Sequence, residues 1–397
     1  MDIKEIERLV QKEYPNTVQW RRHFHMYPEL SFQEVHTPGY IAQFLRELGL
    51  EVQEGVGGRG VVGKLIIDDS YPTVALRADF DALPIHDEKE AAYKSTVPGV
   101  MHACGHDAHT AVVMTAAKIL TAQKDNLRGN VVFIFQHAEE VDPGGAIQMI
   151  RDGCLDGVDA IFGQHVSTSM DVGTVGIRYG IATAMPDDFT VTINGVGSHA
   201  SKPHMSVDPV AAAISFCNQL QYIVTRRSNP MDNVVLSITM FNGGTQHNVI
   251  PDKVVVGGTI RTFKKDTQEV MIAELNRCLK GLAAITGVTY ELDYMRGYPP
   301  VVNEETTTRL VHNIADRVSS VNEVRLLEPE LGGEDFSYYL QRVKGTFFNT
   351  GVRNASFKAD FPHHHSKFDI DEHGMINAVA ILIGAVYEYC EEASHES

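Results

Sequence analysis

The chain has 397 residues, 43% hydrophobic and 21% charged, which is typical of a globular protein with two or three domains or one domain with a large insertion. Its 34 basic and 51 acidic side chains give a net charge of −17, which excludes a surface that attracts nucleic acid or an anionic membrane. We find no apolar run that approaches the roughly 18–20 residues of a membrane span.

The opening segment and the cysteines predict a cytoplasmic protein. The first 15 residues, MDIKEIERLVQKEYP, are charged and helix-like, and they lack the apolar stretch of a secretory signal. The five cysteines are odd in number and scattered along the chain. This is typical of reduced thiols and not of a disulfide framework.

Strands and helices alternate in the first part of the chain. The run VVFIFQ at 131–136 is apolar almost throughout, which favours a strand buried on both faces. Alternating strands and helices predict an α/β domain with a mainly parallel central sheet. In chain order we expect a helix at 37–48, strands at 61–67 and 73–79, a helix at 106–123, a strand at 131–136, a helix at 144–153 and a strand at 159–166.

The pattern changes near residue 184. The next elements follow the order strand, helix, strand, strand, helix, strand, which is that of a ferredoxin-like α+β unit. About 110 residues are enough for a separate domain. We expect strands at 188–195, 233–241, 253–263 and 287–295, with helices at 207–226 and 266–286.

The last hundred residues predict a return to the first domain, with a helix at 304–319, a strand at 346–352 and a helix at 372–390. We therefore predict a discontinuous catalytic domain, 1–184 and 296–397. An inserted lid and dimerisation domain would occupy 185–295.

Two segments carry residues typical of a metal site. In MHACGHDAH, 101–109, Cys104 and His106 lie two residues apart at the start of an expected helix, and both suit zinc, manganese or cobalt. In QHAEE, 136–140, two adjacent glutamates follow a buried strand, where α/β sheets build their sites. Paired carboxylates are costly to bury unless they are paired or bound to a cation.

Three further segments contain candidate histidines: His165 at the end of the next expected strand, PHHHS at 362–366 and GSHAS at 197–201. Each segment alone is more often a solvated loop or a hydrogen-bonded core residue. Their joint arrangement, with two sites after successive strands and a third opening a helix, indicates a metallohydrolase.

The sequence resembles the metal-dependent aminoacylase and carboxypeptidase family. The resembling branch includes hippurate hydrolase, plant auxin-conjugate hydrolases and bacterial N-acyl-amino-acid deacylases. The matching segments run in order through nearly the whole chain: RRHFHMYPELSFQE (21–34), LRADFDALP (76–84), MHACGHDAHTA (101–111), FQHAEE (135–140), GVGSHASKPH (195–204), HNVIPD (247–252), GGEDFSYY (332–339) and HHHSKFDIDE (363–372).

The resemblance implies a catalytic domain with two divalent metal ions, which could be manganese, zinc, cobalt or nickel. It places the general base on Glu139 and the metal ligands on Cys104, His106, Glu140, His165 and His364. Counting back from Phe368 selects His364 within the histidine run. Ser366 departs from the family pattern, which usually has proline there.

The resemblance also assigns residues outside the ligand set. It implies that His199 polarises the scissile carbonyl, in many dimeric relatives across the subunit interface. Asn248, Arg261 and Gly333 fall where relatives contact substrate. Three aspartates, Asp79, Asp81 and Asp107, are better interpreted as groups that orient histidines.

We therefore predict an enzyme that hydrolyses the amide bond of N-acyl amino acids with the help of metal ions. Its substrate would be a small molecule, and it would bind neither nucleic acid nor membrane. We also expect it to form a homodimer or a higher homo-oligomer. An exopeptidase acting on dipeptides is the main alternative. A hydrolase with Cys104 as its nucleophile and a metal-binding protein without activity are the others. The acyl group and the amino acid stay open.

Overall fold

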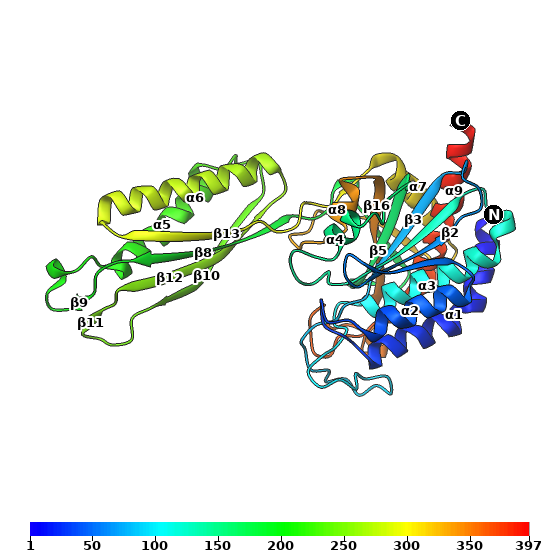
Figure 1. Ribbon diagram of the computed structural model, residues 1–397, viewed down its shortest axis with the longest axis horizontal. Coiled ribbons are helices and arrows are strands. Elements are labelled where there is room, and N and C mark those ends of the chain that lie inside the picture. The colour runs from blue at the N-terminus through cyan, green and yellow to red at the C-terminus, as the bar shows by residue number, and fades with distance from the viewer. Residues whose placement is uncertain (397) are drawn as a thin grey trace. The chain divides into compact units, whose positions relative to one another are not determined.

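The computed structural model describes residues 1–396, which form two compact units (Figure 1). Unit 1 contains Met1–Ala182, Val301–Glu328 and the chain from Asp335 onward. Unit 2 contains Thr183–Pro300 and Pro329–Glu334. We predicted 183–184, 296–300 and 329–334 within the catalytic domain, whereas their contacts group them with unit 2.

A large sheet forms the centre of unit 1. In the described chain it has eight strands, in the order β1-β2-β4-β3-β5-β16-β6-β15. The four strands β4, β3, β5 and β16 run parallel to one another, so the predicted α/β class with a mainly parallel sheet is confirmed. The strand bounds are Glu51–Val56 (β1), Gly60–Leu65 (β2), Thr73–Asp79 (β3), Asn130–Gln136 (β4), Ala160–Asp171 (β5), Thr174–Ile177 (β6), Glu323–Leu326 (β15) and Lys344–Arg353 (β16).

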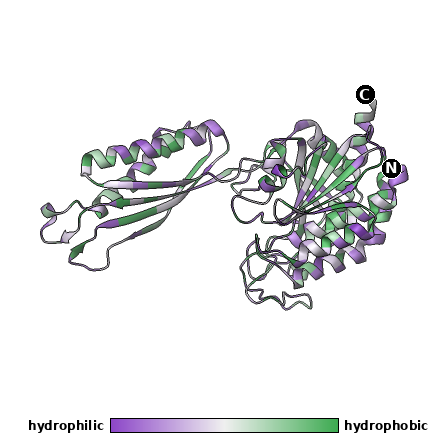
Figure 2. Ribbon diagram, viewed as in Figure 1, coloured by the Kyte–Doolittle hydropathy of each residue, from purple (hydrophilic) through white to green (hydrophobic). Residues whose placement is uncertain are grey.

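Helices cover both faces of this sheet. On one face α1, α3, α7 and α9 pack together with one set of strand side chains in a single large core. On the other face the short helices α4 and α8 cover a smaller core. Figure 2 shows the strands as mainly hydrophobic between these layers. The helix bounds are Ile3–Met26 (α1), His36–Glu47 (α2), His106–Ala122 (α3), Ala146–Arg151 (α4), Glu305–Ala315 (α7), Ser337–Leu340 (α8) and Gly374–Glu396 (α9).

Helix α9 is the most apolar helix of the core. Contrary to the expectation from the sequence, its segment Gly374–Ala393 is long and apolar enough to cross a membrane by length and composition alone. However, 83% of this apolar stretch is buried inside the protein. The helix contacts α1, α3, α7 and the sheet. Such burial is typical of a core helix in a globular fold.

Unit 2 has the ferredoxin-like order. Its four-stranded antiparallel sheet has the order β10-β12-β8-β13, and α5 and α6 pack together and share a core with the sheet. The bounds are Met185–Asn194 (β8), Pro209–Arg226 (α5), Val234–Gly243 (β10), Lys253–Thr262 (β12), Lys265–Thr286 (α6) and Thr289–Met295 (β13).

Each unit also contains one small two-stranded ladder. In unit 2, β9 (Ser198–His199) pairs with β11 (Val249–Ile250), and in unit 1, β7 (Gly180–Ile181) pairs with β14 (Val302–Asn303). Three 3₁₀ turns lie at Lys124–Asn126, Pro203–Met205 and Ala355–Phe357.

Candidate metal centre

The start of helix α3 places two candidate ligands side by side. His106 is the first residue of the helix, and Cys104 lies two residues before it. Gly105 between them has φ +94°, and a Cβ there would lie 2.3 Å from the Val166 side chain. Glycine is therefore required at this position, because it alone tolerates both the left-handed backbone and the close approach.

The two glutamates follow strand β4. Glu139 and Glu140 come after Ala138, which is buried and has φ +51°. A non-glycine residue in this region of backbone space carries strain. The left-handed turn ends the strand, so the two glutamates no longer alternate between the faces of the sheet.

His165 and His364 come from separate parts of unit 1. His165 lies within β5, which is longer than the sequence predicted because β16 pairs with it as far as Asp171, with an irregularity after Ser167. His364 lies in the loop before α9, has φ +63° and donates its backbone N–H to the Ala103 carbonyl at 2.8 Å. That bond ties the His364 loop to the segment that carries Cys104.

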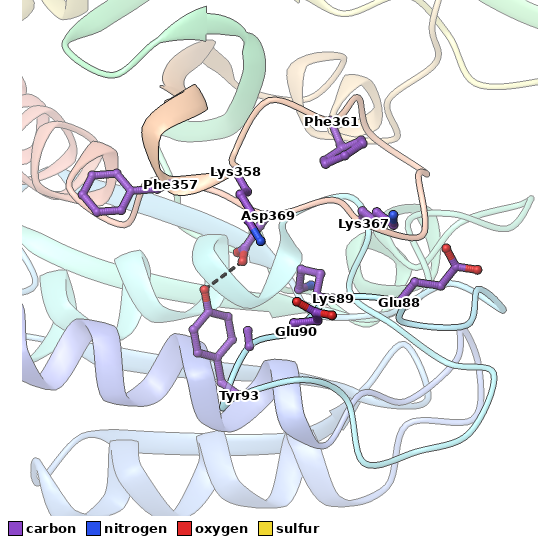
Figure 3. A pocket seen from close by; sticks show the side chains of 10 residues that line it. Glu88, Lys89, Glu90, Tyr93, Phe357, Lys358, Phe361, Lys367 and Asp369 are labelled. Carbon is purple, nitrogen blue, oxygen red and sulfur yellow. Dashed lines mark hydrogen bonds between the residues drawn. The ribbon is translucent and has the colours of Figure 1, made fainter.

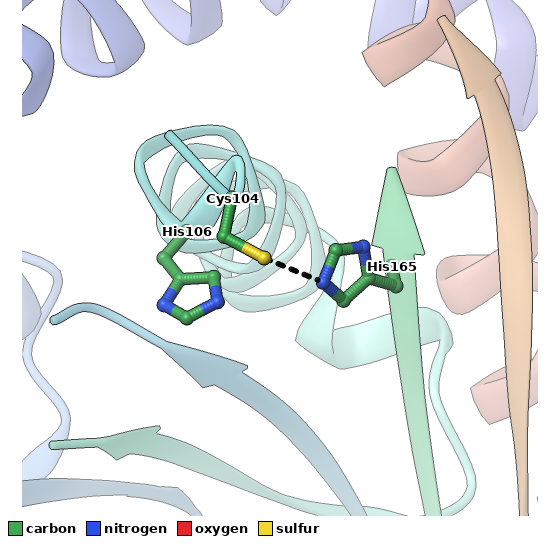
Figure 4. A group of neighbouring side chains, drawn as sticks. All are labelled: Cys104, His106 and His165. Carbon is green, nitrogen blue, oxygen red and sulfur yellow. Dashed lines mark hydrogen bonds between the residues drawn. The ribbon is translucent and has the colours of Figure 1, made fainter. Parts of the chain in front are cut away.

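Unit 1 brings the five residues predicted as ligands together. Candidate ligand atoms lie within 4.8 Å of one another in two groups that share Cys104: the first adds His106 and His165, and the second adds Glu140 and His364. Figure 4 shows the first group, with the Cys104 Sγ 3.4 Å from the His165 Nε2. In the second group, the His364 Nε2 lies 3.3 Å from a Glu140 oxygen.

Two atoms of this cluster support its fit to a cation. The His106 Nε2 is buried without a hydrogen-bond partner in the described chain, and it lies 3.8 Å from the Glu140 Oε1, which itself lies 3.3 Å from the His364 Nε2. Buried polar atoms normally have partners. Thiolate, imidazole and carboxylate ligands together suit zinc and related divalent metals. The residues present therefore fit a metal centre.

Asp81 orients two members of the cluster. The His106 Nδ1–H donates to the Asp81 carbonyl oxygen at 3.0 Å and lies 3.2 Å from the Asp81 carboxylate, which leaves Nε2 as the free ligand atom. The other Asp81 oxygen accepts from the Glu140 backbone N–H at 3.1 Å and from the Ser31 hydroxyl at 2.6 Å. Although burial would raise it, these hydrogen bonds hold the pKa of Asp81 below its usual value.

Asp79 orients His109, which is not among the predicted ligands. His109 accepts the Val166 backbone N–H on Nε2 at 3.0 Å, so its Nδ1–H donates to Asp79 at 2.6 Å. Both ring nitrogens of His109 are therefore occupied, although the ring lies beside His106. The third aspartate, Asp107, contacts His25 at 2.7 Å instead of a predicted ligand.

Two buried arginines form ion pairs with the surrounding acids. Neither arginine was predicted from the sequence to have a role. Arg77 on β3 donates to Asp79 at 2.7 Å and to Asp335 at 2.8 Å. Arg21 on α1 donates to Asp107 at 2.9 Å and to Asp369 at 2.7 Å. An arginine in the middle of the apolar run TVALRAD is the one signal that could have indicated the first pair.

The environment of Cys104 does not activate its thiol as a nucleophile. Burial, with the charge of Glu140 beside it, raises the pKa of Cys104 well above its usual range, although His106 acts in the opposite direction. Burial and the neighbouring His109 hold the pKa of His165, whose Nε2 lies 3.4 Å from the Cys104 Sγ, well below its own usual value. A nucleophilic cysteine needs a lowered thiol pKa or an adjacent base, so this pair of residues is better suited to binding a cation.

Unit 2 places the other four residues in two pairs. His199 is exposed on β9 and pairs with Val249, next to Asn248, whose carbonyl accepts the Ala200 N–H at 3.0 Å. Arg261 on β12 lies opposite Pro186, and Gly333 packs against the same proline, where a Cβ would come within 2.7 Å of it.

A separate cavity of about 350 Å³ lies in unit 1 (Figure 3). Phe361 and Lys367 line it from either side of the His364 loop, and a hydrogen bond of 2.8 Å joins Tyr93 to Asp369 in its wall. Its lining includes no predicted ligand, and we assign it no role.

Comparison with known proteins identifies relatives over nearly the whole chain. The model of Peptidase family M20/M25/M40 matches residues 75–388. Thermostable carboxypeptidase 1 of Saccharolobus solfataricus is 40% identical to this chain, and the aligned region covers 94% of this chain and 93% of the relative. The N-acyl-L-amino acid amidohydrolase of Geobacillus stearothermophilus is 42% identical, and the aligned region covers 76% of this chain and 82% of the relative. A dinuclear metal binding peptidase from Bacillus subtilis, of family M20, has a crystal structure with TM-score 0.82 and 33% identity, covering 96% and 99%.

With these matches, the fold and the site define a hydrolase that acts on amide bonds. The chain belongs to Peptidase family M20/M25/M40, whose model covers most of its length. The resemblance seen in the sequence motifs is thereby confirmed.

Proposed function

We propose that this protein hydrolyses the amide bond of N-acyl amino acids with two divalent metal ions. The observation that carries the proposal is the pair of ligand groups that share Cys104, with an unpartnered buried Nε2 on His106 that lies 3.8 Å from Glu140. The dinuclear metal binding relative and the N-acyl-L-amino acid amidohydrolase relative support it. The ions would be manganese, zinc, cobalt or nickel.

Cys104, His106, Glu140, His165 and His364 would hold the ions. When bound, divalent ions lower the pKa of a coordinated water and polarise the substrate carbonyl. Glu139 is 7% exposed and lies beside the cluster, with one of its oxygens 4.0 Å from the His106 Nε2. We assign it the general base: its carboxylate takes the proton of the attacking water and then delivers it to the leaving amine. An amide needs that delivery, because an amine anion is a very poor leaving group.

Residues of unit 2 would complete the reaction. We assign His199 to the developing oxyanion, and Asn248, Arg261 and Gly333 to substrate contacts. Lid closure would bring His199 to the reacting carbonyl, and in a homodimer this histidine would come from the partner subunit. The protein's five free cysteines are consistent with a location in the cytoplasm.

The carboxypeptidase relative supports one second candidate, an exopeptidase acting on dipeptides. Such an enzyme must recognise a free α-amine, whereas a deacylase must accept a blocked one. The two functions therefore predict opposite substrate preferences.

A substrate panel tests the proposal. The purified enzyme, loaded with manganese or zinc, is assayed on N-acetyl and N-benzoyl amino acids and on the matching dipeptides, before and after chelation. We expect deacylation that a chelator abolishes and added metal restores, with about two ions per chain by metal analysis. Activity that survives complete metal removal would overturn the metal mechanism. Turnover of dipeptides alone would establish the exopeptidase.

A further inference from the structure

The segment at 29–34, between α1 and α2, contacts both loops that carry the candidate site. The Glu29 carbonyl accepts the Ala82 N–H at 2.8 Å, and Ser31 donates to Asp81 at 2.6 Å, on the loop after β3. On the loop after β4, Glu34 accepts the Ala138 N–H at 3.0 Å. One segment thus connects the two strand ends from which the site is built.

Ala138 occupies the turn that directs Glu139 away from β4. Its φ of +51° is unfavourable for a residue with a Cβ. Ala138 is fully buried, so its N–H needs a partner inside the protein. The Glu34 Oε1 is that partner, and the Ala138 carbonyl accepts the Gly145 N–H at 3.0 Å. Both sides of the strained residue are therefore fixed.

Glu34 is buried with its backbone hydrogen-bonded, while the second oxygen of its carboxyl group, Oε2, has no hydrogen-bond partner in the described chain. It is 1% exposed, and its own carbonyl accepts from Arg59 at 2.5 Å. Two residues before it, the Phe32 ring packs edge-on against His137 at 5.8 Å, adjacent to Ala138 in sequence. Burial, together with the charge of Asp81, raises the pKa of Glu34 to about 8, so the side chain is largely neutral at pH 7. Glutamine is then its close mimic.

We propose that Glu34 is a positioning residue for the reaction: its buried carboxyl oxygen holds the left-handed turn at Ala138 and so sets the direction in which Glu139 leaves the strand. The inference rests on the proposed role of Glu139 as general base. The hydrogen bonds of Glu34 in the described chain go to Ala138 and Arg59 and not to a predicted metal ligand. It acts only through the backbone.

Four variants test this inference in the metal-loaded enzyme. Glu34→Gln keeps the acceptor oxygen, whereas Glu34→Leu keeps the volume and removes the acceptor. Ala138→Gly removes the Cβ that makes the turn unfavourable, and it is made alone and together with Glu34→Leu. The readouts are kcat, KM, bound metal and the hydrogen–deuterium exchange of peptides spanning 136–141, which does not depend on any activity.

We expect Glu34→Leu to lower kcat about 10- to 100-fold, as a small displacement of a catalytic group does, with KM and metal content nearly unchanged. Exchange at 136–141 accelerates in the same variant. Glu34→Gln and Ala138→Gly alone resemble the wild type, and the double variant regains part of the lost kcat.

Unchanged kcat and exchange in Glu34→Leu would overturn the inference. Equal damage from Gln and Leu, or no recovery in the double variant, would overturn it as well. If Glu34→Leu does not fold, Glu34→Ala replaces it and the same outcomes decide. A wild-type enzyme inactive on N-acyl amino acids would instead refute the proposed function, while the exchange data still judge the role of Glu34 in the turn.

Discussion

The polar residues assigned to the site are held in different ways in the two units. In unit 1, His106 is fixed by Asp81, and Asp81 is fixed in turn by Ser31 and the Glu140 backbone. In unit 2, His199 is exposed, and within the described chain its Nδ1 accepts hydrogen bonds from the backbone N–H and the hydroxyl of Ser201. Pre-organised ligands suit a permanently bound ion, whereas a loosely held side chain suits a role that begins only when substrate is present.

The largest expected effect tests the unit 1 side of this contrast. We predict that Glu139→Gln lowers kcat about 10²–10⁴-fold, because a general base is lost. The amide has the same size and lies outside the proposed ligand set, so both ions and the thermal midpoint are retained. Steady-state kinetics and metal analysis check this. Loss of the metal would make Glu139 a ligand, and unchanged turnover would remove its catalytic role.

The next effect tests the unit 2 side. We predict that His199→Ala lowers kcat about 10²–10³-fold, the usual result of removing one oxyanion donor. Because the side chain is exposed and packs little, the melting temperature and metal content stay the same. If stability falls while kcat is unchanged, His199 serves only the fold of unit 2.

Mixing two inactive variants sharpens this test. If His199 acts across a subunit interface, heterodimers of His199→Ala and Glu139→Gln contain one site with both wild-type residues. Partial activity then returns, with subunit exchange verified by tagged co-purification. Verified heterodimers without activity would place His199 in its own chain's site or outside catalysis.

A smaller effect is expected from the residues that hold the ligands. We predict that Asp81→Asn weakens metal binding about 10- to 100-fold, as changes to groups behind metal ligands commonly do. Asparagine retains one acceptor oxygen but loses the charge beside His106. Metal affinity is measured by competition with a chelator, with Asp69→Asn, on the exposed turn before β3, as the control. Equal affinities in the two variants would contradict the proposed orientation of His106.

The last prediction concerns stability instead of activity: the free energy of unfolding depends on pH through Glu34. The pKa of Glu34 is raised from an ordinary value of 4.5 to about 8 in the folded protein. At a pH between these two values, the folded state therefore keeps a proton on Glu34 that the unfolded state has lost. Stability therefore falls as pH rises from about 5 to about 8, by at most about 1.4 kcal/mol per pH unit. Glu34→Gln removes this contribution. Parallel pH profiles of chemical denaturation in the wild type and variant would contradict it.

The sequence predicted the parts that depend on local pattern. Apolar runs identified the buried strands β3 and β4, and the motif at 101–109 identified the start of α3 with Cys104 and His106. The short strands β6 and β15 were missed. β6 is buried and β15 lies at the edge of the sheet, but both are short and form only by pairing with distant segments. The Arg77–Asp335 pair was missed for the same reason, since its partners lie 258 residues apart. The function of unit 2 as a lid stays a prediction.

The position of β16 has a consequence for the order of folding. β16 lies between β5 and β6 in the large sheet, yet it is translated after nearly all of unit 2. Until residues 344–353 emerge, β5 has an open edge, and α9 is absent from the core. Unit 2 depends mainly on contacts within 183–300, so we expect it to fold first during synthesis, while the catalytic unit waits for the last strand and helix. Proteolysis of chains truncated before residue 344 reports this order directly: a protected fragment within 183–300 is expected, and equal cleavage throughout the chain would contradict it.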